Sequence, residues 1–166
     1  MAKIKGAKKL NNAISKELKP FGIKCAKCAD TYAYYFDKNM VTFKLTEDTT
    51  EDKWFLEFIE KRFGYKAEYP FIISLLHEIG HSVNNDEITD NLYDFCMREK
   101  ERIDREMQTA DHKKSKKLEF QYFNLPDEIM ATAWAVDFAK SHPKKVEKMW
   151  KKCEKALHKF YAKNLD

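Results

Sequence analysis

The sequence predicts an α+β fold, mostly helical, with a small antiparallel sheet of two or three strands. Its 166 residues have the usual size of a single domain, and we expect one domain over residues 1–166. Only four glycines and four prolines occur, which argues against long irregular segments and against a glycine-rich all-β fold. Lys, Glu, Leu, Ala and Phe dominate, and this composition favours helices.

The first part of the chain contains the whole predicted sheet. Aromatic and β-branched residues fill two runs that Asp37-Lys38-Asn39 joins, and this tripeptide is typical of a turn between strands. A short amphipathic helix precedes them and stops before Pro20. The elements expected here are the helix over 7–18 and strands over 23–26, 32–36 and 40–45.

Helices are expected for the rest of the chain. Thr49 is suited to cap a helix that ends at Gly64, and Pro70 opens the next one, which runs to about Val83. A third helix follows a break at 84–86. Its buried side is expected to carry the apolar residues Ile88, Leu92, Phe95 and Ile103.

Two more helices are expected near the C-terminus, after an exposed, mobile, lysine-rich loop at 113–117. Pro126 opens one that continues through Phe138, and Pro143 separates it from the last. Apolar residues in the last helix recur at spacings of three and four, which indicates a core-facing side rather than a cofactor site. They are Val146, Met149, Trp150, Cys153, Leu157, Phe160 and Tyr161.

One helix carries a motif with chemical meaning, His77-Glu78-Ile79-Gly80-His81. The two histidines are four residues apart, so on a helix both imidazoles lie on one face and can reach a single metal ion. Glu78 is rotated off that line, where a carboxylate can accept a proton from a zinc-bound water. Zinc lowers the pKa of such a water towards ~7, so the motif predicts a hydrolytic zinc site with Glu78 as general base.

The helix around this motif is apolar on nearly every side. Two histidines and a glutamate in such a helix need a partner that offsets their burial, and a metal ion would provide it for the histidines. The alternative is a buried helix whose histidines are satisfied without a metal. Gly80 costs roughly 1 kcal/mol relative to Ala in a helix, so we expect another segment to pass close to it. The predicted sheet is our candidate, because an edge strand beside the metal could hold an extended peptide.

A catalytic zinc usually has three protein ligands, so one more is needed. Glu128 is our choice, because it shares a side of its helix with Ala131 and Ala135, against which the histidine helix can pack closely. As a first-turn acidic residue, Glu128 could instead only complement the helix dipole. The rival third ligands are Asp86, Glu87, Asp90, His112 and His142.

The two motifs together resemble those of zincin metallopeptidases of the gluzincin type. Among these they are most similar to the ImmA/IrrE family, which is often found in phages and mobile elements. The second helix of that family typically reads Glu-x-x-Ala-x-x-aromatic-Ala, and Glu128, Ala131, Trp134 and Ala135 match it. The resemblance implies a zincin-like domain with these roles: zinc ligands His77, His81 and Glu128, and general base Glu78.

We therefore expect a zinc-dependent peptidase that hydrolyses a peptide bond in a protein substrate, through a zinc-bound water activated by Glu78. Several members of the family cleave a repressor protein, so the resemblance implies a protein or peptide partner such as a repressor-like regulator. The alternative is a zinc-binding interaction module on a zincin scaffold with little or no turnover, although an intact Glu78 favours the enzyme. Residues able to stabilise an oxyanion, which the sequence does not rank, are Tyr93, Tyr122, His112 and His142.

Charge and cysteine content constrain the partners and the compartment. The net charge is +4 with both signs interspersed, and the one dense basic run, at 113–117, contains no aromatic residue, which argues against nucleic acid. No apolar run approaches the ~20 residues that span a bilayer, and none follows the basic start as in a secretory signal. We expect a cytoplasmic protein without a membrane partner. Cys25 and Cys28 form a lone CxxC, for which we favour reduced thiols over a structural metal or a disulfide.

Overall fold

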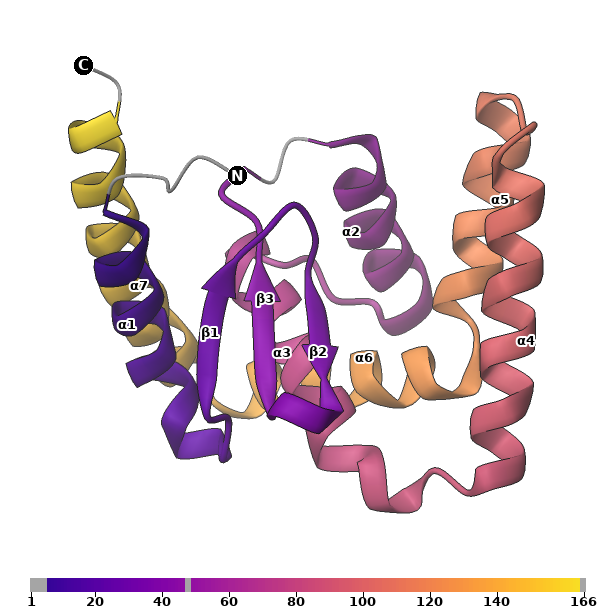
Figure 1. Cartoon of the computed structure of the whole chain (residues 1–166), viewed down its shortest axis with the longest axis horizontal. Helices are drawn as coiled ribbons and strands as arrows, with labels where there is room; N and C mark the ends of the chain where they lie inside the picture. Colours follow the sequence, from indigo (N-terminus) through magenta and orange to yellow (C-terminus); the bar gives the residue numbers. More distant parts are fainter. Residues whose placement is uncertain (1–5, 47–48, 165–166) are drawn as a thin grey trace.

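The computed structural model describes residues 6–46 and 49–164, which form seven α-helices and a three-stranded sheet (Figure 1). The mostly helical α+β class predicted from the sequence is confirmed. The helices are α1 (Ala7–Leu18), α2 (Thr50–Phe63), α3 (Pro70–Asn84), α4 (Asp90–Met107), α5 (His112–Phe123), α6 (Pro126–Ser141) and α7 (Pro143–Asn164). The strands are β1 (Cys25–Cys28), β2 (Ala33–Tyr35) and β3 (Met40–Phe43).

The sheet has the strand order β1-β3-β2, with β3 in the centre. All four residues of β3 are buried, and only β1 and β2 have exposed positions. The short 3-10 turn η2 (Phe36–Lys38) joins β2 to its antiparallel partner β3. β1 is parallel to β3, so the antiparallel sheet that the sequence predicts is wrong for this pair of strands. The reason is the short connection over 29–32, which carries the chain past the central position, so that β3 returns between the two earlier strands.

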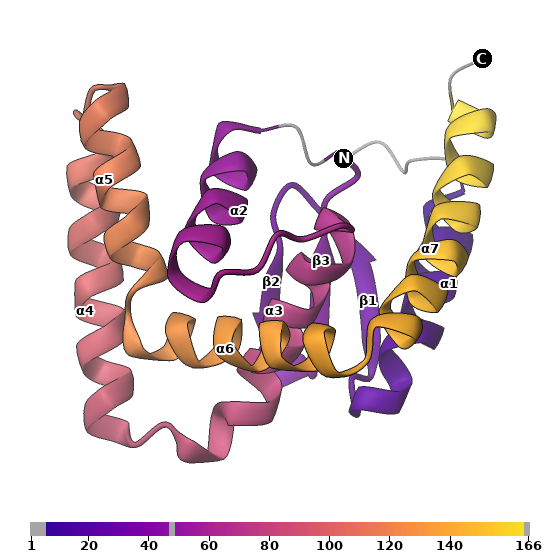
Figure 2. The ribbon, with the colours of Figure 1, turned by 180° about the vertical axis from the view of Figure 1, so that it is seen from behind.

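Helix α3 lies at the centre of the domain. Pro70 occupies its first turn, where backbone N–H groups have no partner within the helix, so proline's lack of an N–H costs no hydrogen bond. Apolar residues from Phe71 to Ile79 are buried on several sides of the helix, because the sheet contacts it on one side and α6 on another. Figure 2, seen from behind, shows α6 in front of α3 and the sheet beyond it.

The two ends of the molecule are helical pairs. At one end α1 packs beside α7 and also covers the edge strand β1, and at the other end α4 packs against α5 (Figures 1 and 2). β2 is therefore the strand nearest to α4 (Figure 1). Among the described residues, no helix combines the length and the apolar character needed to cross a membrane.

Two sequence expectations about the helices at this end are wrong. Residues 113–117 belong to α5 and are not a loop. Their lysines point largely to solvent, whereas Leu118 and Phe123 supply the buried side of α5. The run of lysines by itself contains no apolar residue that would indicate a helix. In α4, Phe95 is 44% exposed, because the buried stripe runs through its neighbour Cys96 and through Ile103.

Candidate metal centre

Helix α3 places two imidazoles side by side. His77 and His81 are one turn apart, and their rings lie 4.7 Å apart between centroids. His77 is only 7% exposed, and the ring of Phe55 from α2 packs edge-on against it at 5.1 Å. The His77 ring is therefore held by the surrounding core, whereas the His81 side chain is 20% exposed and packs against the His77 ring.

Helix α6 brings Glu128 to the same place. Pro126 starts this helix, so Glu128 lies in its first turn, one turn before Ala131. Ala131 lies against Gly80, where a side chain on Gly80 would be 2.5 Å from the Ala131 carbonyl oxygen. The segment that the glycine accommodates is thus α6 and not the sheet, which corrects the sequence-based expectation. This close approach of α3 and α6 brings Glu128 within reach of both histidines.

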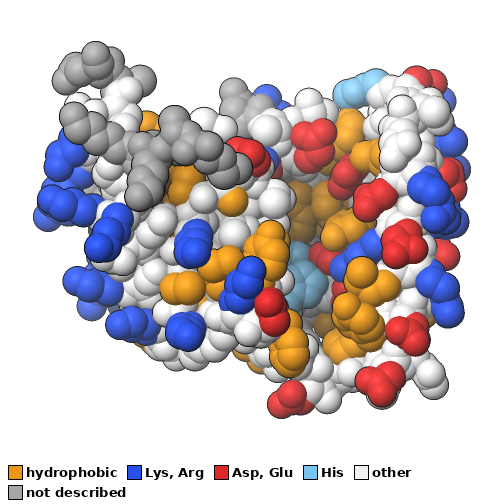
Figure 3. Space-filling view, in the orientation of Figure 1, with side chains coloured by type: hydrophobic (Ala, Val, Ile, Leu, Met, Phe, Trp, Pro, Cys, Tyr) orange, Lys and Arg blue, Asp and Glu red, His pale blue; other side chains and the backbone are white. Residues whose placement is uncertain are grey.

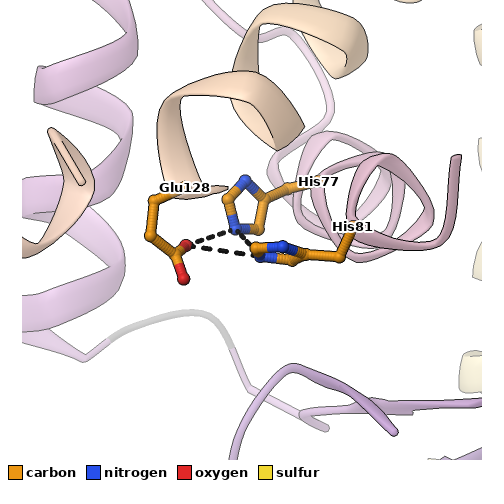
Figure 4. Close-up of side chains that lie close together, drawn as sticks. All are labelled: His77, His81 and Glu128. Carbon is orange, nitrogen blue, oxygen red and sulfur yellow. Dashed lines mark hydrogen bonds and ion pairs between the residues drawn. The ribbon is translucent and has the colours of Figure 1, made fainter. Parts of the chain in front are cut away.

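The donor atoms of these three residues converge on one point (Figure 4). Glu128 Oε2 lies 3.0 Å from His77 Nε2 and 3.4 Å from His81 Nε2, and the two nitrogens are 3.2 Å apart. Ligands bound at ~2.0–2.1 Å around a tetrahedral zinc ion are separated from one another by roughly 3.3 Å. The set also has the chemistry that zinc takes, two imidazoles and a carboxylate, so the residues present fit the metal.

Thr132 fixes the orientation of His77. Its hydroxyl donates to the carbonyl oxygen of Glu128 at 2.9 Å, so towards His77 Nδ1, at 3.0 Å, it can only accept. Nδ1 therefore carries the hydrogen of that contact, and Nε2 is the nitrogen directed at the donor cluster. Thr132 was not among the predicted site residues, although a threonine four residues after Glu128 lies on the same face of α6.

Charges within the cluster are mutually dependent. Burial acts to raise the pKa of Glu128, but His81 and His77 hold it well below its usual range. Burial likewise acts to lower the pKa of His81, yet the Glu128 carboxylate raises it to about 9. Without a metal, the imidazolium of His81 therefore provides part of the positive charge that balances the Glu128 carboxylate.

Glu78 lies close to the proposed ligand atoms but does not belong to the ligand set. Its Oε1 lies 4.0 Å from His77 Nε2, and the residue is 7% exposed. Burial raises the pKa of Glu78, an effect that the neighbouring histidines only partly oppose. A carboxylate with a raised pKa accepts a proton more readily near neutral pH, which is the property of a general base.

A lysine from α4 completes the charged cluster. Lys100 Nζ lies 2.6 Å from Glu128 Oε1 and 2.5 Å from Asp127 Oδ2, and it also stands 5.1 Å from the ring of Tyr122. Burial acts to lower the pKa of Lys100, but Glu128 raises it, so the amine stays charged. Lys100 belongs to neither motif and was not among the predicted site residues. Its sequence signal is the position of a lysine within the buried stripe of Cys96 and Ile103.

The rival third ligands do not join the group. Asp86 and Glu87 lie in the turn that follows α3, and Asp90 begins α4; all three are exposed. The ring of His112 packs against Trp54, and that of His142 stacks on Phe138. Among the described residues, the one His/Cys/Asp/Glu group arranged to hold a metal is His77, His81 and Glu128.

The cysteine pair takes no part in this site. Cys25 and Cys28 are the two ends of β1, so their Cα atoms are about 10 Å apart along an extended chain. A disulfide requires less than ~7 Å, and the two side chains point to opposite faces of the sheet. All four cysteines of the chain are free thiols.

Of the four residues considered for stabilising an oxyanion, Tyr122 alone contacts the cluster, through Lys100. Tyr93 is 56% exposed on α4. Burial, with Glu128 nearby, raises the pKa of Tyr122, so its phenol keeps its proton.

Comparison of the chain with models of protein families, with curated proteins and with solved structures gives no match.

Proposed function

We propose that the protein is a zinc-dependent peptidase in which His77, His81 and Glu128 bind the metal and Glu78 is the general base. The observation that carries the proposal is the convergence of three donor atoms, with a second carboxylate, that of Glu78, beside them but outside the ligand set. When bound, zinc supplies a Lewis acid that polarises a carbonyl group and lowers the pKa of water. Membership of the ImmA/IrrE family is part of the same proposal and rests on the residues of the two motifs.

Glu78 supplies the proton transfer in this proposal. Its Oε1 accepts a proton from the attacking water and later gives it to the leaving amine. Burial serves this role, since the raised pKa of Glu78 brings it nearer to the pH at which both steps must run. The two histidines and Glu128 meanwhile keep their positions, held by Thr132 and by the packing of α3 on α6.

A hollow above the histidines is suited to a peptide. Figure 3 shows a histidine at the floor of this hollow, with hydrophobic side chains on both sides. Exposed large apolar residues lie on the elements of both walls: Tyr35 and Phe36 where β2 ends, and Tyr93, Phe95 and Met97 on α4. The outer edge of β2 has no strand partner among the described residues, so an extended peptide could add to it.

The alternative function, a zinc-binding interaction module without turnover, uses the same metal ligands. It does not require a buried carboxylate beside them, whereas a carboxylate whose burial the neighbouring histidines only partly offset is expected of a general base. We therefore favour the peptidase.

The test compares zinc-loaded wild type with Glu78→Gln on a library of unstructured peptides, with new termini read by mass spectrometry. We expect the wild type to cleave, and the variant to lose roughly 10²–10⁴-fold in rate while it keeps its zinc, because an amide cannot accept the proton. Glu17→Gln is the matched control, since Glu17 has a side-chain exposure of 15% and pairs with Lys152 on the far helices. It should cleave like the wild type.

One outcome would contradict the role of Glu78, and another would contradict the peptidase itself. Equal cleavage by Glu78→Gln and wild type would remove Glu78 from the mechanism. A zinc-loaded wild type that cleaves no peptide of the library would favour the interaction module.

A further inference from the structure

Lys100 is a basic side chain that contacts the proposed ligand set from a third helix, α4. Its Nζ bridges two adjacent carboxylates of α6, Asp127 and Glu128, at 2.5 and 2.6 Å. The lysine side chain is 17% exposed, and its amine lies over the ring of Tyr122. The pair is therefore built into the interior and is not a surface ion pair of little energetic weight.

The contact divides the two oxygens of Glu128 between two partners. Oε1 faces Lys100, whereas Oε2 faces His77 and His81. A carboxylate free on both sides can bind a metal through one oxygen or both, but here one oxygen already accepts a charge-assisted hydrogen bond. Outer partners of this kind orient metal ligands.

The lysine also balances the charge of the buried site. Glu128 shares Lys100 with Asp127 and also interacts with Glu78, so the site holds three carboxylates, of which a divalent ion would neutralise only two. Lys100 supplies the third positive charge, and the cost of burying unpaired charges is thereby avoided. Asp127 depends on this contact, because its other oxygen, Oδ1, is buried without a hydrogen-bond partner.

We propose that Lys100 is a positioning residue that holds Glu128 as a single-oxygen ligand and keeps one coordination position open for water or substrate. This inference rests on the proposed metal site, and it adds a residue from α4 that neither motif contains. The positioning acts through Glu128, so its direct consequence is the number of ligands around the metal and not the presence of the metal.

Cobalt(II) is the probe, because its d–d absorption is more intense in four-coordinate than in five-coordinate sites. We expect the cobalt-loaded wild type to show the intense spectrum of a four-coordinate site. Lys100→Met frees Oε1 of Glu128 to bind as well, so a several-fold loss of d–d intensity is expected. Lys100→Arg, which retains a charged donor, should recover most of that intensity.

Lys44→Met is the matched control. Lys44 forms a similarly buried bridge to Asp52, at 2.6 Å with side-chain exposures of 13% and 17%, but at the start of α2 and away from the metal ligands. It should lower the melting temperature and leave the cobalt spectrum unchanged. If Lys100→Met fails to fold because Asp127 loses its partner, Lys100→Met combined with Asp127→Asn removes that unpaired charge and serves in its place.

The outcomes separate this inference from the proposed function. If wild type and variant bind cobalt with the same spectrum, Lys100 does not position Glu128, and the metal site itself stands. A five-coordinate spectrum in the wild type would also overturn the role of Lys100. If the wild type binds no cobalt, the metal site fails and the role of Lys100 fails with it.

Discussion

Gly80 of α3 lies against the backbone of Ala131 in α6. A Cβ atom on Gly80 would lie 2.5 Å from the carbonyl oxygen of Ala131 and 2.8 Å from its Cα, closer than real Cβ atoms approach. Both obstructing atoms belong to the backbone, so no side-chain rotation can relieve the contact. The absence of one side chain therefore sets the distance between the two helices that carry the proposed metal ligands.

Gly80→Ala should separate α3 from α6. We expect a net loss of up to about 2 kcal/mol in the free energy of unfolding, because overpacking costs ~1–3 kcal/mol and better helix propensity returns ~1 kcal/mol. Moving α6 also draws Glu128 away from the histidines, so the affinity for zinc should fall together with stability. Thermal unfolding and zinc titration of the same variant measure both effects.

Gly64→Ala is the control for that variant. Gly64 ends α2 in the left-handed conformation (φ 61), and a Cβ there would meet nothing within 4 Å. The substitution should cost about 1–2 kcal/mol through backbone strain alone and leave zinc affinity unchanged. If Gly80→Ala also spares zinc affinity, close packing of α3 on α6 is not what positions Glu128.

Thr132→Val should weaken zinc binding without a large change of shape. The isosteric valine cannot accept from His77 Nδ1, so the imidazole loses the contact that directs its Nε2 at the cluster. We expect zinc affinity to fall roughly 10–100-fold and stability to fall by about 1–3 kcal/mol, since a buried ring N–H is left without a partner.

Thr42→Val separates the two effects of that change. Thr42 is a buried threonine whose hydroxyl donates to the Thr31 carbonyl oxygen at 2.9 Å, within the sheet and away from the ligands. Its loss should lower stability alone. Unaltered zinc affinity in Thr132→Val would show that His77 is oriented by packing and not by this hydroxyl.

The motif residues were predictable because their relationship is local. The spacing of His77 and His81 fixes them on one helix face, and Glu128 could be selected from the small residues that follow it. The structure brings these three together as predicted; that they bind zinc is still a proposal.

Other parts of the site depend on tertiary packing that the sequence does not display. The position of Lys100 in the buried stripe of α4 indicates that it faces a neighbour, but the sequence does not indicate that this neighbour is α6. Gly80 signalled a close neighbour, but the sequence could not say that α6, rather than the sheet, would occupy the space.

Glu119 on α5 should make stability depend on pH. Burial, followed by the nearby charges of Glu51, Asp104 and Glu128, raises the pKa of Glu119 to about 7. The folded state therefore retains a proton that the unfolded chain loses near its ordinary pKa of about 4.3, so this group lowers stability as the pH rises from there to about 7. Glu119→Gln should melt at a higher temperature than wild type at about pH 8, and the difference should vanish near pH 4.

Glu57→Gln provides a contrast of opposite sign. The hydrogen bonds from Lys116 and Lys61 lower the pKa of the partly exposed Glu57 carboxyl, so its contribution to stability is present at neutral pH and is lost on acidification. This variant should be slightly less stable than wild type at about pH 8. If the gap between Glu119→Gln and wild type does not change with pH, Glu119 does not retain its proton in the folded state.

The most direct test is a zinc titration of wild type and Glu128→Ala, with bound metal measured by elemental analysis and affinity by chelator competition. We expect about one zinc ion per chain in the wild type. The affinity of Glu128→Ala should fall by more than the ~10–100-fold typical of outer partners, whereas Asp86→Ala, which changes a rival ligand, should match the wild type. A wild type that binds no zinc, or a Glu128→Ala variant that binds it equally well, would contradict the site formed by His77, His81 and Glu128.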